Sequence, residues 1–400
     1  MLTFLILQRA LREVNIVFTN YTIFFQTFFT NRIVIKRLIL YNKFGFYVNG
    51  YIFFQNFEKE QTPLTIYDIS KQAGVSIATV SRVLNGSANV KPKTRKKVLD
   101  VIEQCGYTPN AFARGLGLNS MNTVGILCAD CSDLYLAKAV YYIEKNLRGG
   151  GYHTVLGCTG YQLEDKKASL AMLLDQRVDA VIMVGSNFIE AQSGDNEYIR
   201  DAASQVPIML LNADLDCPGV YCTMCDDFKA TQEVTLSLLD HGIHDILYLY
   251  NSTSYSGIKK LTGYQSAYLM KDIPINKQFQ QYFNGSHEDI DGVCKLLTEL
   301  HKKGLEFHAV LASDDMLATG AVKYAKLHHR SIPDDLSVIG YNNSLLTTCS
   351  DPEITSIDNH LETLCSQLVK TCIGTLNGEE MPQKTIFSGE LVHKATTKLI

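Results

Sequence analysis

The sequence of 400 residues predicts a chain of class α+α/β, in which a small helical domain precedes a larger α/β domain with parallel sheets. Residues 64–105 show three short stretches of helical periodicity separated by glycine turns. Beyond Asn122, short apolar runs alternate with amphipathic segments, a pattern typical of βα units. The alternation falls into two blocks, before and after about 222–227, which predicts two similar lobes.

The helical domain begins with the pattern of a helix-turn-helix unit. A first helix is expected at Tyr67–Ala73 and a second at Ile77–Leu84. Gly74 between them accepts the positive φ of a tight interhelical turn. Ser76 is suited to cap the second helix by accepting a backbone N–H bond. In such units the second helix enters the major groove of DNA.

A third helix is expected at Thr94–Gln104, with Val98, Leu99 and Ile102 turned inward and Gly106 as its stop. This part of the chain is also basic. Residues 64–118 carry eight Lys or Arg and three acidic residues, a net charge of +5. The whole chain carries −4. A basic module on an acidic chain indicates a polyanionic partner, and the alternative is a small helical domain with a solvated basic face.

The order of residues is more specific than the charge. The informative runs are Thr65-Ile66-Tyr67-Asp68-Ile69, Ala73-Gly74-Val75-Ser76, Ala78-Thr79-Val80-Ser81-Arg82-Val83-Leu84-Asn85, Gly106-Tyr107 and Pro109-Asn110. These runs resemble the LacI/GalR family of bacterial transcription regulators, and the resemblance continues more loosely to near the C-terminus. It implies a DNA-binding domain at 64–109, a hinge at 110–121, and a two-lobed, periplasmic-binding-protein-like domain at 122–400 for effector binding and dimerisation.

The resemblance implies that a homodimer reads a near-palindromic operator in double-stranded DNA. Arg82 is expected to contact guanine, while the apolar Ile77 and Ala78 suit thymine methyl groups. Phosphate contacts are expected from Tyr67, Ser76, Thr79, Ser81, Asn85 and Asn110. Hinge contacts are expected from Ala113, Arg114 and Leu116, with the leucine wedged into the minor groove. Gly115 and Gly117 each disfavour a helix by about 1 kcal/mol, which predicts a hinge that is disordered away from DNA; a flexible interdomain linker is the alternative.

The resemblance also implies a ligand cleft at the carboxyl ends of the strands. Its expected contacts are Tyr135, Lys260, His287, Ser313, Asp314 and Asn342. Relative to the family pattern, Lys260 replaces Arg, Ser313 replaces Asn, and Asn342 replaces Asp. These changes remove a bidentate fork and a carboxylate, which weakens the case for an ordinary monosaccharide and predicts a more positive cleft. A carbohydrate-related effector is expected, with an acidic or phosphorylated sugar derivative, or a degenerate pocket, as open alternatives.

Motifs for catalysis or cofactor binding are weak. Gly149-Gly150-Gly151 follows a predicted helix and reads as a helix stop rather than a phosphate loop. The pairs Cys128/Cys131 and Cys222/Cys225 have the spacing of zinc or redox sites. The first begins at a strand end, the second lies in an apolar strand-like run, and neither has a flanking helix start, so we interpret them as core or cleft cysteines. We expect no enzyme activity, metal or cofactor. Eleven cysteines without a secretory signal favour reduced thiols and a cytoplasmic protein.

Residues 1–63 differ from the rest, since they hold 11 of the 18 Phe and show no strand or helix period. We expect this segment to be non-native or disordered, with translation starting near Leu64. A membrane anchor is the rival interpretation, although 15–30 is short and interrupted for a span. With such an anchor the chain would be a solute-binding protein of an importer, which is the alternative function.

Overall fold

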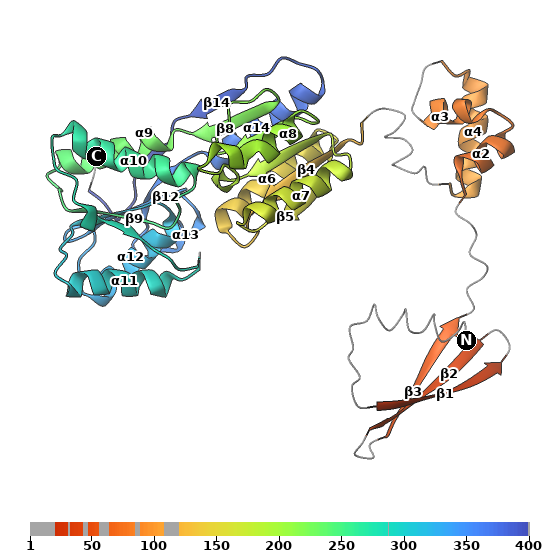
Figure 1. The fold of residues 1–400 in the computed structure, drawn as a ribbon, viewed down its shortest axis with the longest axis horizontal. Coiled ribbons are helices and arrows are strands. Elements are labelled where there is room, and N and C mark those ends of the chain that lie inside the picture. The colour runs from red at the N-terminus through yellow and green to blue at the C-terminus, as the bar shows by residue number, and fades with distance from the viewer. Residues whose placement is uncertain are drawn as a thin grey trace. The chain divides into compact units, whose positions relative to one another are not determined.

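The computed structural model describes residues 21–30, 33–42, 47–55, 64–84, 89–107, 120–286 and 288–398. The chain forms two compact units, Met1–Pro109 and Asn110–Ile400, which are treated separately here (Figure 1). Among the described residues, none of the helices has the length and apolar character needed to cross a membrane.

The first strands lie in the N-terminal segment. β1 (Tyr21–Thr30), β2 (Ile33–Asn42) and β3 (Tyr47–Gln55) form an antiparallel sheet in the order β1-β2-β3. The segment therefore forms strands although its sequence shows no strand period. Antiparallel pairing is made by the backbone, and a segment rich in aromatic and β-branched residues favours it without strict alternation. The proposed start near Leu64 stays a prediction.

Three helices follow, α2 (Ile66–Ala73), α3 (Ile77–Leu84) and α4 (Pro92–Cys105). Thr65 and Asp68 form a capping box at the start of α2, and Gly74 ends this helix with φ 57°. Ile69, Ala73, Val80, Val83 and Val98 form the buried core. Leu99 is 46% exposed, so its expected inward position is wrong. The α4 residues packed on the core are spaced by three or four, and position 99 is rotated away from that stripe.

Lobe 1 contains a six-stranded sheet in the order β14-β8-β7-β6-β4-β5. Its strands are β4 (Thr123–Cys128), β5 (His153–Cys158), β6 (Ala180–Val184), β7 (Ile208–Leu211), β8 (Val220–Cys225) and β14 (Lys384–Phe387). All pairings in this sheet are parallel. The helices of lobe 1 are α6 (Leu134–Gly149), α7 (Leu163–Asp175), α8 (Glu197–Ala203) and α14 (Leu361–Leu376). The near-continuous apolar strands are buried on both faces, as parallel sheets require.

Lobe 2 has a second six-stranded sheet in the order β10-β9-β11-β12-β13-β15. Its strands are β9 (Ile246–Tyr250), β10 (Gln280–Tyr282), β11 (Ala309–Ala312), β12 (Ser337–Tyr341), β13 (Thr355–Asp358) and β15 (Glu390–Val392), the last of which is antiparallel. Its helices are α9 (Asp227–Asp240), α10 (Tyr255–Met270), α11 (Ile290–Lys302), α12 (Asp315–Leu327) and α13 (Leu345–Cys349).

The chain passes between the lobes three times. It leaves lobe 1 after β8, returns through the segment between β13 and α14, and crosses again between β14 and β15 (Figure 1). The two predicted blocks are therefore confirmed as lobes, and the last two strands complete one sheet each. Residues that immediately follow parallel strands lie at one edge of each sheet, which is where the lobes meet and a ligand cleft is expected.

Candidate operator surface and effector cleft

The outer face of α3 carries the residues expected to read bases. Ile77 is 39% exposed, and Ala78 and Arg82 are also exposed, while Val80 and Val83 hold the helix on the core. Among residues 64–84 and 89–107, no side chain pairs with the Arg82 guanidinium. This face therefore presents one free cation beside two apolar side chains.

Residues expected at phosphates surround that face. Tyr67 on α2 is 67% exposed, and Ser76 is exposed at the start of α3. The Thr79 backbone N–H donates to Ser76 Oγ at 3.3 Å, so the predicted cap of α3 is present. Thr79 and Ser81 are half-buried. The remaining expected contacts lie outside the described residues and stay predictions: Asn85, Asn110, Ala113, Arg114 and Leu116.

A cavity of about 730 Å³, including its open mouth, lies between the lobes at the carboxyl ends of the strands. Its lining is dominated by amides and hydroxyls. The amides come from Asn187, Asn212, Asn251, Asn342 and Asn359, and the serine hydroxyls from Ser186, Ser252, Ser254, Ser256 and Ser313. The charged side chains described in the lining are Asp133, Asp314 and Lys260. Such a surface suits a polar ligand with many hydrogen-bonding groups.

Tyr135 lies in the first turn of α6, which Asp133 caps by accepting from the Leu136 N–H at 2.9 Å. The Tyr135 hydroxyl accepts from Asn212 Nδ2 at 2.5 Å and from Asn359 Nδ2 at 3.0 Å. Burial raises the pKa of Tyr135 well above its usual value, so the hydroxyl stays neutral. The Tyr135 hydroxyl is therefore held in place by two amides.

Asn359 was not predicted from the sequence, although it is central to the cleft. It is 2% exposed, follows β13, and donates from Nδ2 to Asn342 Oδ1 at 3.2 Å as well as to Tyr135. Its own Oδ1 is buried and has no hydrogen-bond partner among the described residues. A buried carbonyl oxygen without a donor is costly, so the Asn359 amide is held by its two donated hydrogen bonds alone.

Lys260 is 9% exposed and points into lobe 2. Its Nζ donates to the Ser313 carbonyl at 3.1 Å and lies 3.6 Å from the centroid of the Tyr341 ring. Asp227 accepts from the Tyr341 and Ser256 hydroxyls, each at 2.5 Å. The ammonium is therefore already engaged.

Asp314 caps α12, accepting from the Leu317 N–H at 2.8 Å, and also accepts from Asn251 Nδ2 at 2.7 Å. Burial raises its pKa. With Asp133 and Asp314 against one cation, Lys260, the described lining is not positive. The expectation that the cleft is more positive than the family pattern stays a prediction.

Five of the six expected effector contacts line this one cavity: Tyr135, Lys260, Ser313, Asp314 and Asn342. The sixth, His287, lies outside the described residues. The missed residues share a signal, because Asn212, Asn251 and Asn359 each directly follow a strand of a parallel sheet. Polar residues at that position point into the cleft of such folds.

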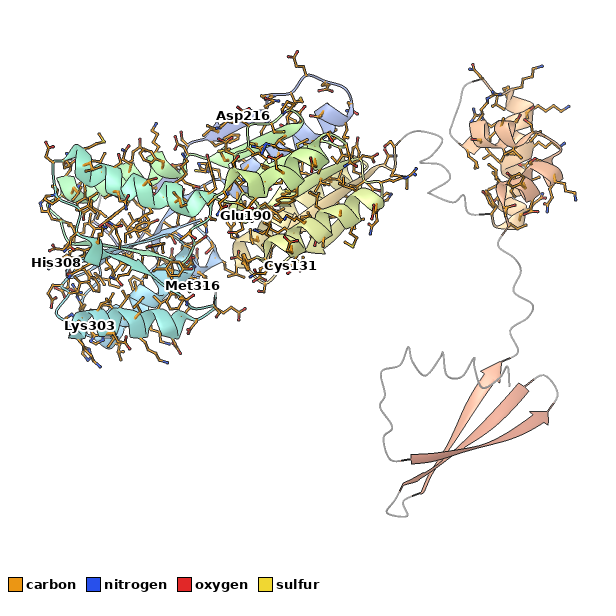
Figure 2. The ribbon with its side chains drawn as sticks, in the orientation of Figure 1. Cys131, Glu190, Asp216, Lys303, His308 and Met316 are labelled. Carbon is orange, nitrogen blue, oxygen red and sulfur yellow. A yellow bond between two sulfur atoms is a disulfide. The ribbon has the colours of Figure 1, made fainter. Side chains whose placement is uncertain are left out.

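Within the described part of the chain, no group of three His, Cys, Asp or Glu side chains is placed to hold a metal ion. Burial raises the pKa of Cys128 to about 11 and that of Cys225 to about 12, which disfavours their thiolates. Cys131 and Cys158 form a disulfide on lobe 1 (Figure 2), so the expectation of reduced thiols throughout is wrong. These residues are 27 apart in sequence but lie at neighbouring strand ends, a proximity that spacing does not reveal.

Comparison with known families matches two parts of the chain. Residues 65–110 match the model of bacterial regulatory proteins of the lacI family, and 236–397 match a periplasmic binding protein-like domain. An HTH-type transcriptional regulator of Lachnoclostridium phytofermentans is 52% identical over 84% of this chain and 99% of its own. Catabolite control protein A of Priestia megaterium is 32% identical over 74% of this chain and 87% of its own.

Solved structures share the fold. The lac repressor dimer bound to operator and an anti-inducer aligns with a TM-score of 0.73 at 24% identity, over 84% of this chain and 99% of that one. A complex of the transcriptional regulator CelR with cellobiose aligns with a TM-score of 0.60 at 23% identity, over 83% of this chain and 99% of that one. The alternative of an importer's solute-binding protein is wrong, because the relative that is 52% identical along nearly its whole length is a transcriptional regulator.

Proposed function

The chain belongs to the lacI family of bacterial regulatory proteins and is a transcriptional regulator, and from this we propose that it is a repressor controlled by a neutral, hydroxyl-rich carbohydrate. In this proposal a homodimer binds a near-palindromic operator, and the effector occupies the cleft between the lobes. The single observation that carries the effector class is the lining of the cleft, in which five asparagine amides and five serine hydroxyls surround the cavity.

The operator proposal is supported by the exposed face of α3. Arg82 is positioned for a bidentate contact to guanine, and Ile77 for a thymine methyl group. The net charge of +5 on residues 64–118 supplies attraction to phosphates. The lac repressor, which has the same fold, is bound to its operator as a dimer. The leucine wedge of Leu116 belongs to the same proposal.

The effector proposal follows from what the cleft offers. The amides and hydroxyls of the lining can each pair with a sugar hydroxyl, as donor or as acceptor. An anionic ligand would also meet Asp133 and Asp314, while the cation Lys260 is already bound to the Ser313 carbonyl and the Tyr341 ring. We therefore favour a neutral sugar over the acidic derivative. The complex of CelR with cellobiose gives an example of such a ligand on this fold.

A thermal-shift comparison tests the effector class. The protein is heated with D-glucose, cellobiose, D-glucuronate and D-glucose 6-phosphate, each at several concentrations. We expect a concentration-dependent rise of Tm with a neutral sugar and none with the anions. Asn359→Leu should abolish the rise, whereas the control Asn146→Ala, on α6 and hydrogen-bonded to Ser366, should keep it. Stabilisation by the anionic sugars alone would contradict the proposal.

A genomic binding selection followed by footprinting tests the operator. Fragments of the host genome are captured by the protein at about 0.15 M salt and sequenced. We expect enrichment of one near-palindrome and protection of both half-sites, with affinity that falls steeply as salt rises. A reporter placed behind that site should be transcribed less when the protein is present. Activation of the reporter would contradict the repressor assignment.

The proposal also includes a cytoplasmic location, where bacterial chromosomal DNA lies, and no catalytic role. Its support is the regulatory family and a cleft whose charged side chains are bound to the backbone. Asp133 caps α6, Asp314 caps α12, and Lys260 donates to the Ser313 carbonyl. Incubation with aryl glycosides should release no phenol.

A further inference from the structure

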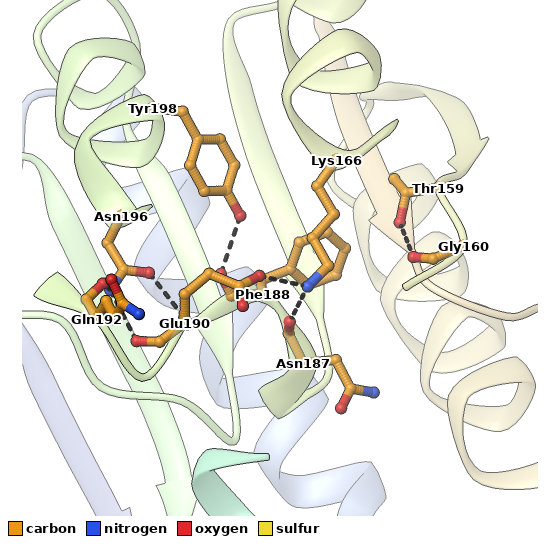
Figure 3. A network of polar contacts seen from close by, with 9 residues as sticks. All are labelled: Thr159, Gly160, Lys166, Asn187, Phe188, Glu190, Gln192, Asn196 and Tyr198. Carbon is orange, nitrogen blue, oxygen red and sulfur yellow. Dashed lines mark hydrogen bonds and ion pairs between the residues drawn. The ribbon is translucent and has the colours of Figure 1, made fainter. Parts of the chain in front are cut away.

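A buried lysine lies behind the wall of the cleft in lobe 1. Lys166 on α7 is 3% exposed. Its Nζ donates to the Asn187 carbonyl at 2.5 Å and to Glu190 Oε1 at 2.6 Å (Figure 3). An apolar side chain would fill this position without the desolvation cost of an ammonium group. The hydrogen bonds of Lys166, rather than the volume that its side chain fills, therefore distinguish it from an apolar residue at this position.

Both partners belong to the 185–196 loop, which follows β6. Side chains hold the backbone of this loop. Tyr198 donates to the Phe188 carbonyl at 2.9 Å, and Asn196 accepts from the Glu190 N–H and donates to its carbonyl. A loop without ladder hydrogen bonds depends on such contacts for its shape. Lys166 adds a charged side chain to the contacts that hold this loop.

The same loop builds the cleft and touches the other lobe. Ser186 and Asn187 line the cavity. Figure 3 shows the Asn187 side chain directed away from Lys166, while its carbonyl faces the ammonium. The Ser186 hydroxyl donates to Ser254 Oγ at 2.8 Å, and Ser254 caps α10 of lobe 2. The loop therefore joins lobe 1 to lobe 2 at the cleft.

We propose that Lys166 is a positioning residue of the cleft. With Glu190 as its counter-charge, it holds the Asn187 carbonyl, and thereby keeps Ser186 in place to bond Ser254 when the lobes approach. Loss of Lys166 frees the loop and weakens the contact between the lobes, without touching the helix-turn-helix unit. The inference rests on the proposed function only in treating the cleft as the effector's site.

Hydrogen–deuterium exchange of the full chain tests the first step. In Lys166→Met, which keeps an unbranched side chain but removes the ammonium, amides of the 185–196 loop should exchange about tenfold faster, because a charge-assisted hydrogen bond is lost. Amides of β6 should not change. The matched control is Lys167→Met on the same helix, whose ion pair with Glu164 is exposed, and it should leave the loop unchanged. If Lys166→Met does not fold, Glu190→Gln replaces it, with acceleration in the same loop expected.

Cross-linking tests the second step. The pair Ser186→Cys and Ser254→Cys is oxidised, and the bond between these two positions is quantified by tandem mass spectrometry. Its initial rate should fall at least about threefold when Lys166→Met is added and stay constant with Lys167→Met. Unchanged exchange in the loop, or faster exchange with an unchanged cross-linking rate, would overturn the inference. Neither measurement uses an effector, so failure of the carbohydrate screen would not affect this result.

Discussion

On α3, Arg82 and Ile77 project from a small core that they do not help to build, whereas in the cleft the polar side chains bind one another. Tyr135 is held by Asn212 and Asn359, and the Lys260 ammonium by the Ser313 carbonyl. A substitution on the outer face of α3 should therefore change affinity for a partner and leave stability unaltered. A substitution in the cleft should change stability before any ligand is present. The predictions below test this contrast, beginning with the largest expected effect.

Asp227→Ala should destabilise the two-lobed domain by about 4 kcal/mol, because the buried hydroxyls of Tyr341 and Ser256 both lose their acceptor. Urea unfolding followed by tyrosine fluorescence and circular dichroism measures this. The counterpart is Asp68→Ala, which removes an exposed carboxylate from the capping box of α2 and should cost about 1 kcal/mol. Similar effects of the two substitutions would remove the contrast between the regions.

Stability of the two-lobed domain should fall as pH rises from about 4 to about 6. Burial raises the pKa of Asp315 to about 6 from an unfolded value near 3.8, so the folded state binds the extra proton in this window. The ionised carboxylate then costs roughly 3 kcal/mol above pH 6. Asp315→Asn should flatten the profile measured by urea unfolding between pH 4 and 8.

Asp291 on α11 provides the control of opposite sign. It is exposed, and its hydrogen bond to Lys323 lowers its pKa. Its contribution is therefore present above pH 4 and lost as pH falls through the lowered pKa. Asp291→Asn should leave the slope between pH 4 and 6 intact. If the slope between pH 4 and 6 persists in Asp315→Asn, another titrating group causes it.

Arg82→Ala should weaken binding to the selected operator about 10- to 100-fold, the value of one lost bidentate contact to guanine. Since Arg82 is exposed and unpaired among the described residues, the unfolding midpoint should not move. Fluorescence anisotropy on the operator and on a scrambled duplex gives both affinities. Equal losses on the two duplexes would mean that Arg82 contacts phosphate rather than a base.

Ser76→Ala should give the smallest effect, a loss of about 1 kcal/mol in the stability of the helix-turn-helix unit, because the Thr79 N–H loses its side-chain acceptor. Ser76→Asp, which also caps a helix, should retain stability but weaken DNA binding through repulsion of phosphate. Recovery of stability together with full DNA binding in Ser76→Asp would exclude Ser76 as a phosphate contact.

The helix-turn-helix unit could be predicted closely because its determinants are local. The turn depends on Gly74, the cap on Ser76, and the core on apolar residues three or four apart. The error at Leu99 arose where an apolar residue one position beyond the core stripe faces solvent. The two lobes and their parallel sheets were also predictable, since βα alternation is a repeated local pattern.

Individual residues of the cleft could be predicted, but the contacts between them could not. Resemblance located Tyr135, Lys260 and Asn342, but it did not indicate that Asn359 would bridge two of the expected contacts. The link from Asn359 to Tyr135 joins positions 224 residues apart, which no local pattern encodes. The engagement of Lys260 by the Tyr341 ring is another such link, which leaves its ammonium less available to an anionic ligand than the sequence suggested.

The three passages of the chain between the lobes also constrain the timing of folding during synthesis. The helix-turn-helix unit is complete once residue 107 has left the ribosome, and its contacts are local. Neither sheet of the second unit has its full set of strands until β14 and β15, at Lys384–Phe387 and Glu390–Val392, have emerged. A nascent chain therefore carries a complete DNA-binding unit through most of its translation. Each lobe is completed only near the end of synthesis, lobe 1 by β14 and lobe 2 by β15.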